Sequence, residues 1–253
     1  MQNDGYGSFI LAAIQCFFDE RLPDMGGEAL FRRLERLGAE AELCWNQPDA
    51  GLWEFRTRSE VHTHSTLMCW AGYDRLARIA RKLGLGPEEV HRSASTERVR
   101  VAILDQSLNA DRGCFVATFG GAEVDASLLL MAQIGLIAAD DPRFLATVAA
   151  CEVELRFGSH LYRYRRPDDF GAPEAAFTAC TFWLIDALVR IGRHDEARAI
   201  LGDVLARRNH LGLLFDGVHV GSGEQWGNFP RTYSMVGPIN AAMALSRRWE
   251  DVL

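Results

Sequence analysis

The sequence is short of the features that mark secreted, membrane-spanning and nucleic-acid-binding proteins. Its six cysteines are scattered, with no CxxC pair or other close spacing: Cys16, Cys44, Cys69, Cys114, Cys151 and Cys180. This pattern predicts free thiols, most of them buried, in a reducing compartment rather than a disulfide framework. The basic residues form no tract and the net charge is -7, which argues against an extended surface for phosphates or anionic lipids. We therefore expect no nucleic-acid partner and no membrane partner.

Long apolar runs are also missing. No segment approaches the roughly 18 uninterrupted apolar residues of a membrane span, and the first residues lack the basic start of a secretory leader. The composition of the 253 residues, 48% hydrophobic and 24% charged, is that of a globular protein with a sizeable core. These features predict a soluble, cytoplasmic protein, and the length alone allows one domain or two.

Strand signal is sparse and helical spacing of apolar residues is frequent, so the expected fold class is all-α. Pro87 and Pro142 indicate the starts of helices, and Gly84 indicates an end. The predicted helices number about nine and cover residues 6–20, 28–43, 62–83, 87–107, 124–138, 141–155, 174–191, 194–208 and 232–246.

Two kinds of helix alternate along the chain. More apolar helices begin near residues 6, 62, 124, 174 and 231, and more amphipathic ones begin near 28, 88, 141 and 194. A two-helix unit that recurs in this way is typical of stacked repeats, with the apolar helices inside. The loops that enter the inner helices carry Glu54, Asp125, Asp169 and Glu224, so we expect these loops to form a binding mouth. An open helical scaffold with merely polar turns is the alternative.

The first and the last of these loops place a carboxylate beside an indole. Glu54 follows Trp53 and precedes Phe55, and an apolar setting of this kind raises the pKa of a carboxyl group. Glu224 precedes Trp226 but has polar neighbours, which favour an ionised carboxylate. Glycoside hydrolysis needs one protonated and one ionised carboxyl group, and aromatic rings stack on sugars. The pair predicts a carbohydrate site, although an isolated Glu in a loop is more often a solvated surface residue.

Other chemistry finds less support. His62 and His64 lie two residues apart at a helix start and do not share a face, so we interpret them as a polar helix entrance or a sugar contact rather than metal ligands. The glycine pairs lack the context of a phosphate-binding loop, and no serine lies in a nucleophile elbow. We expect no metal and no cofactor.

Several segments, spread over nearly the whole chain, carry recognisable motifs in a fixed order. The two carboxylate segments are 47–54, followed by 62–70, and 223–230, followed by Tyr233 and 239–242. The matching stretches between them are 119–127, 163–174 and 180–183. Together these segments resemble glycoside hydrolase family 15, the family of glucoamylases and bacterial trehalases.

The resemblance implies an (α/α)6 toroid of six helix pairs and inverting hydrolysis of an α-glucosidic bond at a non-reducing end. Glu54 would be the general acid and Glu224 the general base, with carboxyl groups roughly 6.5–9.5 Å apart to leave room for water. Trp53 would be a platform for sugar. The substrate-binding residues that the resemblance implies are Asp49, Trp53, His62, Trp70, Arg163, Asp169, Trp183, Trp226 and Asn228.

The sequence also departs from the family pattern. Family members usually have an N-terminal β-sandwich domain and early barrel helices with an Arg-Asp motif, whereas this chain opens at residues 2–7 with the family's later Asp-x-Tyr-Gly pattern. We therefore expect a single toroidal catalytic domain over 1–253 with about nine of twelve helices. An open ring exposes apolar helix flanks, which predicts a homo-oligomer or docking of a missing N-terminal segment.

The function expected from these residues is hydrolysis of malto-oligosaccharides or trehalose, weak or absent in this chain alone. The sequence does not separate the two substrates. A non-catalytic carbohydrate-binding or structural remnant of the fold is the main alternative, and a helical scaffold that binds protein is a weaker one.

Overall fold

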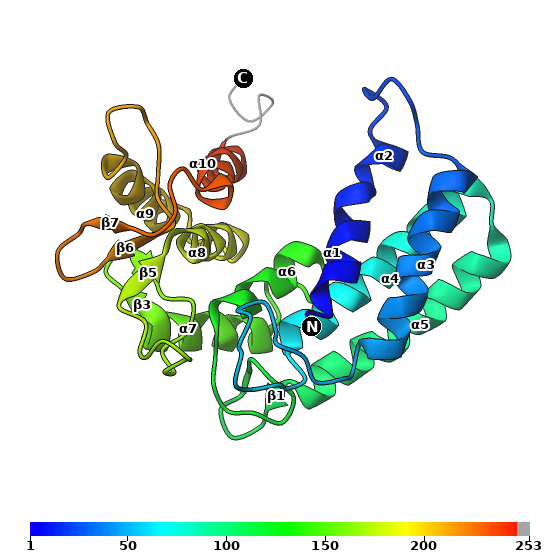
Figure 1. Cartoon of the computed structure of the whole chain (residues 1–253), viewed down its shortest axis with the longest axis horizontal. Coiled ribbons are helices and arrows are strands. Elements are labelled where there is room, and N and C mark those ends of the chain that lie inside the picture. The colour runs from blue at the N-terminus through cyan, green and yellow to red at the C-terminus, as the bar shows by residue number, and fades with distance from the viewer. Residues whose placement is uncertain (247–253) are drawn as a thin grey trace. The chain divides into compact units, whose positions relative to one another are not determined.

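The computed structural model describes residues 1–246, and their contacts divide the chain into two compact units (Figure 1). The first unit contains residues 1–110 and 116–123, and the second contains 111–115 and the chain from 124 onward. The prediction of one toroidal domain over 1–253 stays a prediction. No helix among residues 1–246 is long and apolar enough to cross a membrane.

The nine predicted helical segments are confirmed, two of them with an interruption. In the first unit the helices are α1 (Asp4–Ala13), α2 (Gln15–Phe18), α3 (Glu28–Cys44), α4 (Thr63–Leu83) and α5 (Gly86–Gln106). In the second unit they are η1 (Ala126–Leu129), α6 (Leu130–Ile134), α7 (Pro142–Leu155), α8 (Thr178–Arg190), α9 (His194–Ala206) and α10 (Thr232–Leu245). The segment 6–20 is thus split into α1 and α2, and the segment 124–138 into η1 and α6.

The ends of several helices follow from local chemistry. Asp141 caps α7 by accepting a hydrogen bond from the backbone N–H of Arg143, and Pro142 takes the first helical position. Gly84 ends α4 and Gly135 ends α6, each in the left-handed conformation that glycine adopts without a steric penalty. The signals at Gly84, Asp141 and Pro142 are therefore ones that the fold uses, whereas α6 ends at Gly135, before the predicted end at residue 138.

The first unit is built around α4. Helices α1, α3 and α5 all pack against it (Figure 1), and every residue from Thr63 to Tyr73 is buried. Gly7 of α1 lies so close to this helix that an added Cβ would stand 1.8 Å from the carbonyl oxygen of Met68. The two backbones meet where side chains are absent, which makes α4 the inner helix that its apolar pattern predicts.

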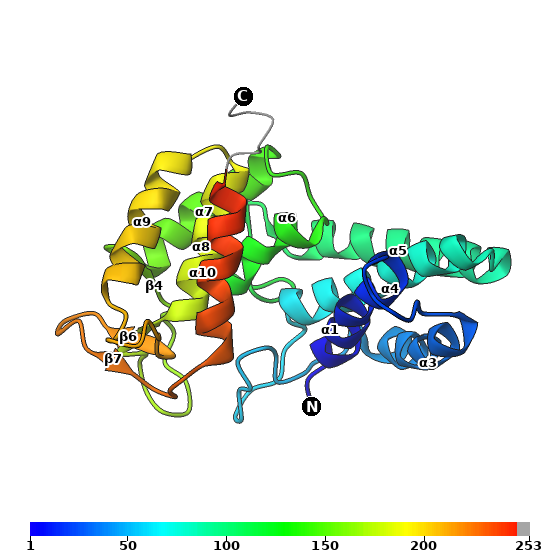
Figure 2. The same cartoon turned by 90° about the horizontal axis from the view of Figure 1, so that it is seen from above.

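The second unit is built around α8. Helices α9, α10 and η1 pack against it, and Figure 2 shows α8, α9 and α10 side by side. A three-stranded antiparallel sheet precedes α8, with strands β5 (Ala175–Phe177), β6 (Gly217–His219) and β7 (Gln225–Trp226) in that order. Ala175 pairs with His219, and Gly217 pairs with Trp226. The sheet therefore ties the segment before α8 to the loop that carries Glu224.

The remaining strands are two residues long, which agrees with the sparse strand signal. They are β1 (Leu108–Asn109), β2 (Cys114–Phe115), β3 (Arg156–Phe157) and β4 (His160–Leu161). All six cysteines are free, and Cys69, Cys114, Cys151 and Cys180 are buried. The prediction that most thiols are free and buried is confirmed.

Candidate active site

Glu54 lies in a tight turn in the first unit. Its backbone N–H donates to Gly51 O (3.1 Å), and Phe55 N–H donates to Ala50 O (3.0 Å). Among residues 1–246, Glu54 is the non-glycine residue with a positive φ, at 57°. Such a conformation is uncommon outside glycine and is often kept for a function. The side chain is exposed, so the burial between Trp53 and Phe55 that the sequence suggested is not observed; Trp53 itself is partly buried.

The start of the chain holds this loop in place. Ala50 N–H donates to Met1 O (3.0 Å), and the Gln2 side-chain amide donates to Gly51 O (3.1 Å). Asp49 is buried, and its Oδ2 accepts from Asn3 N–H and from the Ser65 hydroxyl, both at 2.8 Å. One oxygen of Asp49 therefore braces the loop, while its Oδ1 is buried without a hydrogen-bond partner among the described residues.

His62 forms a second wall of the same loop. It is buried, stacks on Phe55 with ring centroids 5.9 Å apart, and its Nε2 has no partner among the described residues. Its ring would lie 2.7 Å from a Cβ at Gly51, which has φ of 65°. The loop therefore needs glycine at this position both for its backbone conformation and for space.

Trp70, a predicted site residue, and His64, which lies close to His62 in the sequence, are both on α4. Trp70 is buried, and its indole N–H has no partner among the described residues. Burial lowers the pKa of His64 to about 4, and the charge of His62 acts in the same direction. His64 is therefore a neutral buried ring, which agrees with a helix entrance, and no group of three or more His, Cys, Asp or Glu within residues 1–246 could hold a metal ion.

Asp4 is a residue of this region that sequence reasoning missed as a site residue. It is buried at the start of α1, and its Oδ1 has no partner among the described residues. Burial raises the pKa of Asp4 above its ordinary value, and the charges of Asp49 and Glu54 raise it further. The Asp-x-Tyr-Gly pattern at residues 4–7 was the available signal, but a local pattern does not reveal which carboxylates a buried site brings together.

Glu224 lies in the second unit, in the hairpin that joins β6 and β7. Its side chain is exposed, and Trp226 Nε1–H donates to its Oε2 (3.3 Å). Gln225 points inward, where its side-chain oxygen accepts from Phe215 N–H (3.0 Å) and its amide donates to the carbonyl of Arg207. The hairpin is thus anchored by Gln225 and presents Glu224 to solvent in a polar setting.

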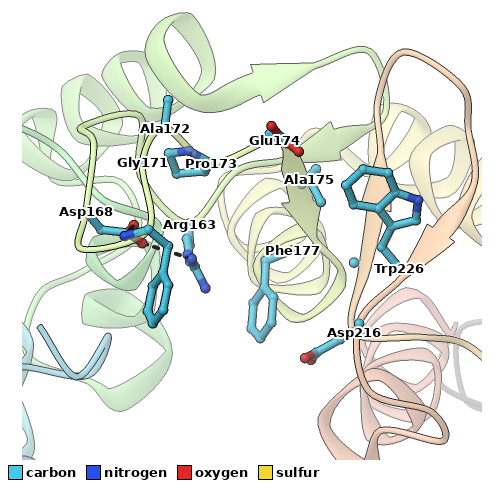
Figure 3. Close-up of a pocket in the computed structure, with 14 residues that line it drawn as sticks. Arg163, Asp168, Gly171, Ala172, Pro173, Glu174, Ala175, Phe177, Asp216 and Trp226 are labelled. Carbon is cyan, nitrogen blue, oxygen red and sulfur yellow. Dashed lines mark hydrogen bonds and ion pairs between the residues drawn. The ribbon is translucent and has the colours of Figure 1, made fainter.

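A pocket of about 390 Å³ lies beside this hairpin (Figure 3). This volume is within the range of about 300–1,000 Å³ that small-molecule sites occupy. The side chains and backbone that line it are those of Arg163, Asp168, Phe170, Gly171, Ala172, Pro173, Glu174, Ala175, Ala176, Phe177, Asp216, Gly217, Trp226 and Gly227. Figure 3 shows Trp226 on one side of the pocket and Arg163 with Asp168 on the other.

Asp168, the neighbour of the predicted Asp169, is a carboxylate that lines the pocket. Its Oδ2 accepts from the Tyr164 hydroxyl (2.6 Å) and from Arg163 (3.2 Å). Burial acts to raise the pKa of Asp168, but the hydrogen bonds from Tyr164 and Phe170 N–H and the charge of Arg163 outweigh it, so the pKa is lowered. Asp169 is exposed and does not line this pocket.

Of the other predicted site residues of the second unit, some line this pocket and others do not. Arg163 and Trp226 line the pocket, and Asn228 lies next to it, where its amide donates to Asp216 Oδ2 (3.4 Å). Trp183 is on α8 and lines a separate cavity of about 140 Å³ against α10, so the structure does not bring it to the same pocket. Glu174 and Asp216 are lining carboxylates that the sequence pattern did not single out.

Known proteins with similar sequences are trehalases. The trehalase of Thermoplasma volcanium is 33% identical over 249 residues, which cover 97% of this chain and 39% of that protein. The trehalase of Mycobacterium tuberculosis is 34% identical over 227 residues, which cover 88% of this chain and 33% of that protein. The chain thus spans about two fifths or less of the length of these relatives.

Solved structures with a similar fold are glycosidases. A glycosidase variant in complex with glucose has a TM-score of 0.77 at 21% identity, covering 97% of this chain and 67% of that one. The glucoamylase of Saccharomycopsis fibuligera has a TM-score of 0.79 at 12% identity, covering 96% of this chain and 70% of that one. These likenesses show the fold, and they confirm the expected fold class, the all-α hairpin architecture of the glucoamylase-type six-hairpin glycosidases.

The sequence comparison shows the family as well as the fold. The family model for glycosyl hydrolases family 15 matches residues 1–243, which include both carboxylate loops and the pocket. On this match, the chain belongs to glycosyl hydrolase family 15.

Proposed function

We propose that this chain carries both catalytic carboxyl groups of an inverting α-glucoside hydrolase, with Glu54 as general acid and Glu224 as general base. The observation that carries the proposal is the polar, aromatic-walled pocket directly beside the hairpin of Glu224. A base that activates water must be ionised and reachable by solvent, and Glu224 is exposed in a polar turn.

The pocket has the chemistry of a glucose subsite. Arg163 and the ionised Asp168 offer a donor and an acceptor for sugar hydroxyl groups, since charged groups form the stronger hydrogen bonds. Trp226 offers an apolar surface for the face of a pyranose. On the first unit, the unpartnered buried atoms of Asp49 and His62 are further candidates for hydroxyl contacts beside Glu54. Trp53 is a candidate platform.

In this proposal Glu54 protonates the leaving oxygen while Glu224 removes a proton from the attacking water. No metal or cofactor takes part. The two carboxyl groups would stand roughly 6.5–9.5 Å apart in the working enzyme, and this separation stays a prediction.

Trehalose is the substrate we favour. The relatives named trehalases share 33–34% of their residues with this chain, whereas the glucoamylases share 12–15% and support the fold alone. Malto-oligosaccharides remain the alternative substrate, because an open groove and a closed pocket can be built from the same family motifs. We also retain the proposal that the protein acts in the cytoplasm.

Self-association is part of the proposal. The exposed apolar side chains Tyr233, Val236, Ile239 and Met243 follow helical spacing on α10, and Phe9 is exposed on α1. Burying such surface is favourable. We propose that a second copy of the chain covers these helices, with a separate N-terminal segment as the other occupant, and that the chain as a dilute monomer hydrolyses sugar weakly or not at all.

The test is glucose release from trehalose and from maltotriose, measured over a range of protein concentrations with the anomer followed by NMR. We expect β-glucose from maltotriose and equal initial amounts of β- and α-glucose from trehalose, because the leaving glucose of trehalose keeps its own α configuration. Release per chain should rise with protein concentration, and Glu54→Gln and Glu224→Gln should each lose about a thousandfold or more. Glu60→Gln is the matched control and should keep full activity. Initial release of α-glucose from maltotriose, of α-glucose alone from trehalose, or activity that survives either catalytic substitution, would contradict the assignment.

A non-catalytic carbohydrate-binding remnant of the fold is the second candidate. One observation favours it: Glu54 is exposed rather than set in an apolar wall. Sugar binding without glucose release at any protein concentration is the outcome that this reading predicts.

A further inference from the structure

Three side chains of the β6–β7 hairpin, those of His219, Trp226 and Glu224, form a connected unit. The imidazole of His219 stacks on the indole of Trp226, with ring centroids 4.5 Å apart and planes inclined by 18°. The indole Nε1–H then donates to Glu224 Oε2 (3.3 Å). The backbone closes the same unit, because His219 N–H donates to Glu224 O (2.8 Å). The carboxylate is therefore linked to His219 by the backbone and through the indole.

His219 is itself held by the turn. Its Nδ1 accepts from Ser222 N–H (3.1 Å) and lies 2.9 Å from the Ser222 hydroxyl oxygen. The same hydroxyl oxygen accepts from Glu224 N–H (3.3 Å). The ring is thus held at its Nδ1 edge by Ser222 and on one face by the stack on Trp226.

Trp226 has two different environments. His219 covers one face of the indole, and Trp226 is one of the side chains that line the pocket, opposite Arg163 (Figure 3). The side chain is 38% exposed, so the surface that His219 does not cover is open to a ligand. A sugar ring that packs against this surface would meet an indole that is already aligned.

We propose that His219 is a positioning residue that holds Trp226 so that the indole serves two tasks, forming a wall of the sugar pocket and orienting the carboxylate of Glu224. Occupation of the pocket and orientation of Glu224 are then coupled: a pyranose stacked on Trp226 restricts the indole, and the restricted Nε1–H fixes Glu224 Oε2. The role assigned to Glu224 rests on the function proposed above, whereas the coupling of His219, Trp226 and Glu224 does not.

The stack acts by limiting the rotamers of Trp226 and Glu224 rather than by changing the charge of either. An exposed carboxylate samples several rotamers, and a general base acts only in those that point at the reacting water. One charge-assisted hydrogen bond from a fixed donor selects among these rotamers. Without the stack, the indole itself adopts several rotamers, and its N–H no longer favours one rotamer of the Glu224 carboxylate.

The test compares two substitutions that separate the contacts of His219. His219→Asn keeps an acceptor near Ser222 N–H but removes the stack, and His219→Phe keeps the stack but removes the acceptor. His210→Asn, an exposed histidine in a neighbouring loop, is the matched control. Circular dichroism establishes that each variant is folded.

The first readout needs no turnover. The indole N–H signal of Trp226 is assigned by its loss in Trp226→Phe, and its hydrogen exchange is followed by NMR with and without glucose. We expect the signal to shift in Glu224→Gln, the exchange to speed up about tenfold in His219→Asn, and little change in His219→Phe or His210→Asn. Glucose should slow the exchange in the wild type and less so in His219→Asn.

The second readout is the split between kcat and KM. We expect His219→Asn to lower kcat about tenfold and to raise KM by a smaller factor, and His219→Phe to retain most of kcat. An unchanged Trp226 signal and exchange rate in folded His219→Asn would overturn the coupling. If the wild type releases no glucose but the Trp226 signal responds as described, the proposed function fails and the coupling stands.

Discussion

The two units present their candidate catalytic carboxylates in opposite ways. Glu54 stands on a left-handed turn that is bonded to the start of the chain and backed by buried polar side chains, among them Asp49 and His62. Glu224 stands on an exposed hairpin, where its neighbours are a stacked ring pair and a hydroxyl group. The placement of the first depends on the fold of its unit. The placement of the second depends on surface contacts that can change without unfolding.

The largest effect expected from this comparison is on the stability of the first unit. Gly7→Ala would place a Cβ 1.8 Å from Met68 O, which is backbone and cannot swing aside, whereas a Cβ at Gly5 on the same helix meets nothing within 4 Å. We expect Gly7→Ala to lower the free energy of unfolding by about 3–5 kcal/mol. Gly5→Ala should leave it unchanged or raise it by up to about 1 kcal/mol.

Urea unfolding of the two variants measures this difference. Because residues 1–3, which hold the loop of Glu54, lead directly into α1, Gly7→Ala should weaken sugar contacts of the first unit at denaturant concentrations where Gly5→Ala still binds. Equal stability of the two alanine variants would break the comparison, since α1 and α4 would then not be in close backbone contact.

The next effect is a pH dependence of stability in the first unit. Burial lowers the pKa of His64 to about 4, from 6.5 in an exposed histidine. Between these values the unfolded chain binds a proton that the folded chain does not, so stability falls as the pH decreases. The slope is about 1.4 kcal/mol per pH unit, or about 3 kcal/mol in all.

The measurement is urea unfolding of wild type and His64→Gln at pH 7 and pH 4.5. The wild type should lose stability between the two values, and the variant should lose less. His160, the buried histidine of β4 in the second unit, also has a lowered pKa because of burial. The loss of stability between the two pH values is therefore also measured in His160→Gln and compared with that in His64→Gln. A drop of the same size in wild type and His64→Gln would show that other groups carry the dependence.

The smallest effect expected is on binding in the second unit. Asp168 lies in the pocket and accepts from Arg163 and Tyr164, whereas Asp169 is exposed beside it. Asp168→Asn should weaken glucose binding about tenfold, because the ionised acceptor and the alignment of Arg163 are both lost. Asp169→Asn should change it by less than about twofold.

Calorimetric titration with glucose, with unfolding checked by circular dichroism, decides between these two neighbours. Weaker binding in Asp169→Asn with normal binding in Asp168→Asn would favour Asp169, the residue predicted from the sequence, as the sugar-binding carboxylate. It would also mean that the loop 165–171 has a different conformation when sugar is bound.

The helices of this chain could be predicted from sequence because their signals are local. Apolar spacing, Pro87, Pro142 and the terminal glycines are read within a few residues, and the nine segments follow. The break between α1 and α2 at Ile14 has no such signal, since no proline, glycine or capping residue lies next to it. Beyond the break, Gly26 N–H donates to Cys16 O in α2 (2.6 Å).

The candidate site could be predicted only in outline. The two Glu loops are predicted from local sequence, but which of Asp168 and Asp169 lines the pocket depends on the three-dimensional contact with Tyr164, and sequence distance does not contain that information. Trp183 belongs to the segment 180–183, which resembles the family, yet it lies on α8 and lines the cavity against α10. Local sequence does not show the role of Asp4, because the charges that act on its pKa, those of Asp49, Glu54 and His62, come from residues more than forty positions away.

The bond from Ala50 N–H to Met1 O has a practical consequence for work with this protein. The amino terminus is fastened to the turn that carries Glu54, with Gln2 and Asn3 completing the attachment. A purification tag placed ahead of Met1 would therefore be fused next to the turn that carries the proposed general acid, and any strain it introduces would act there first.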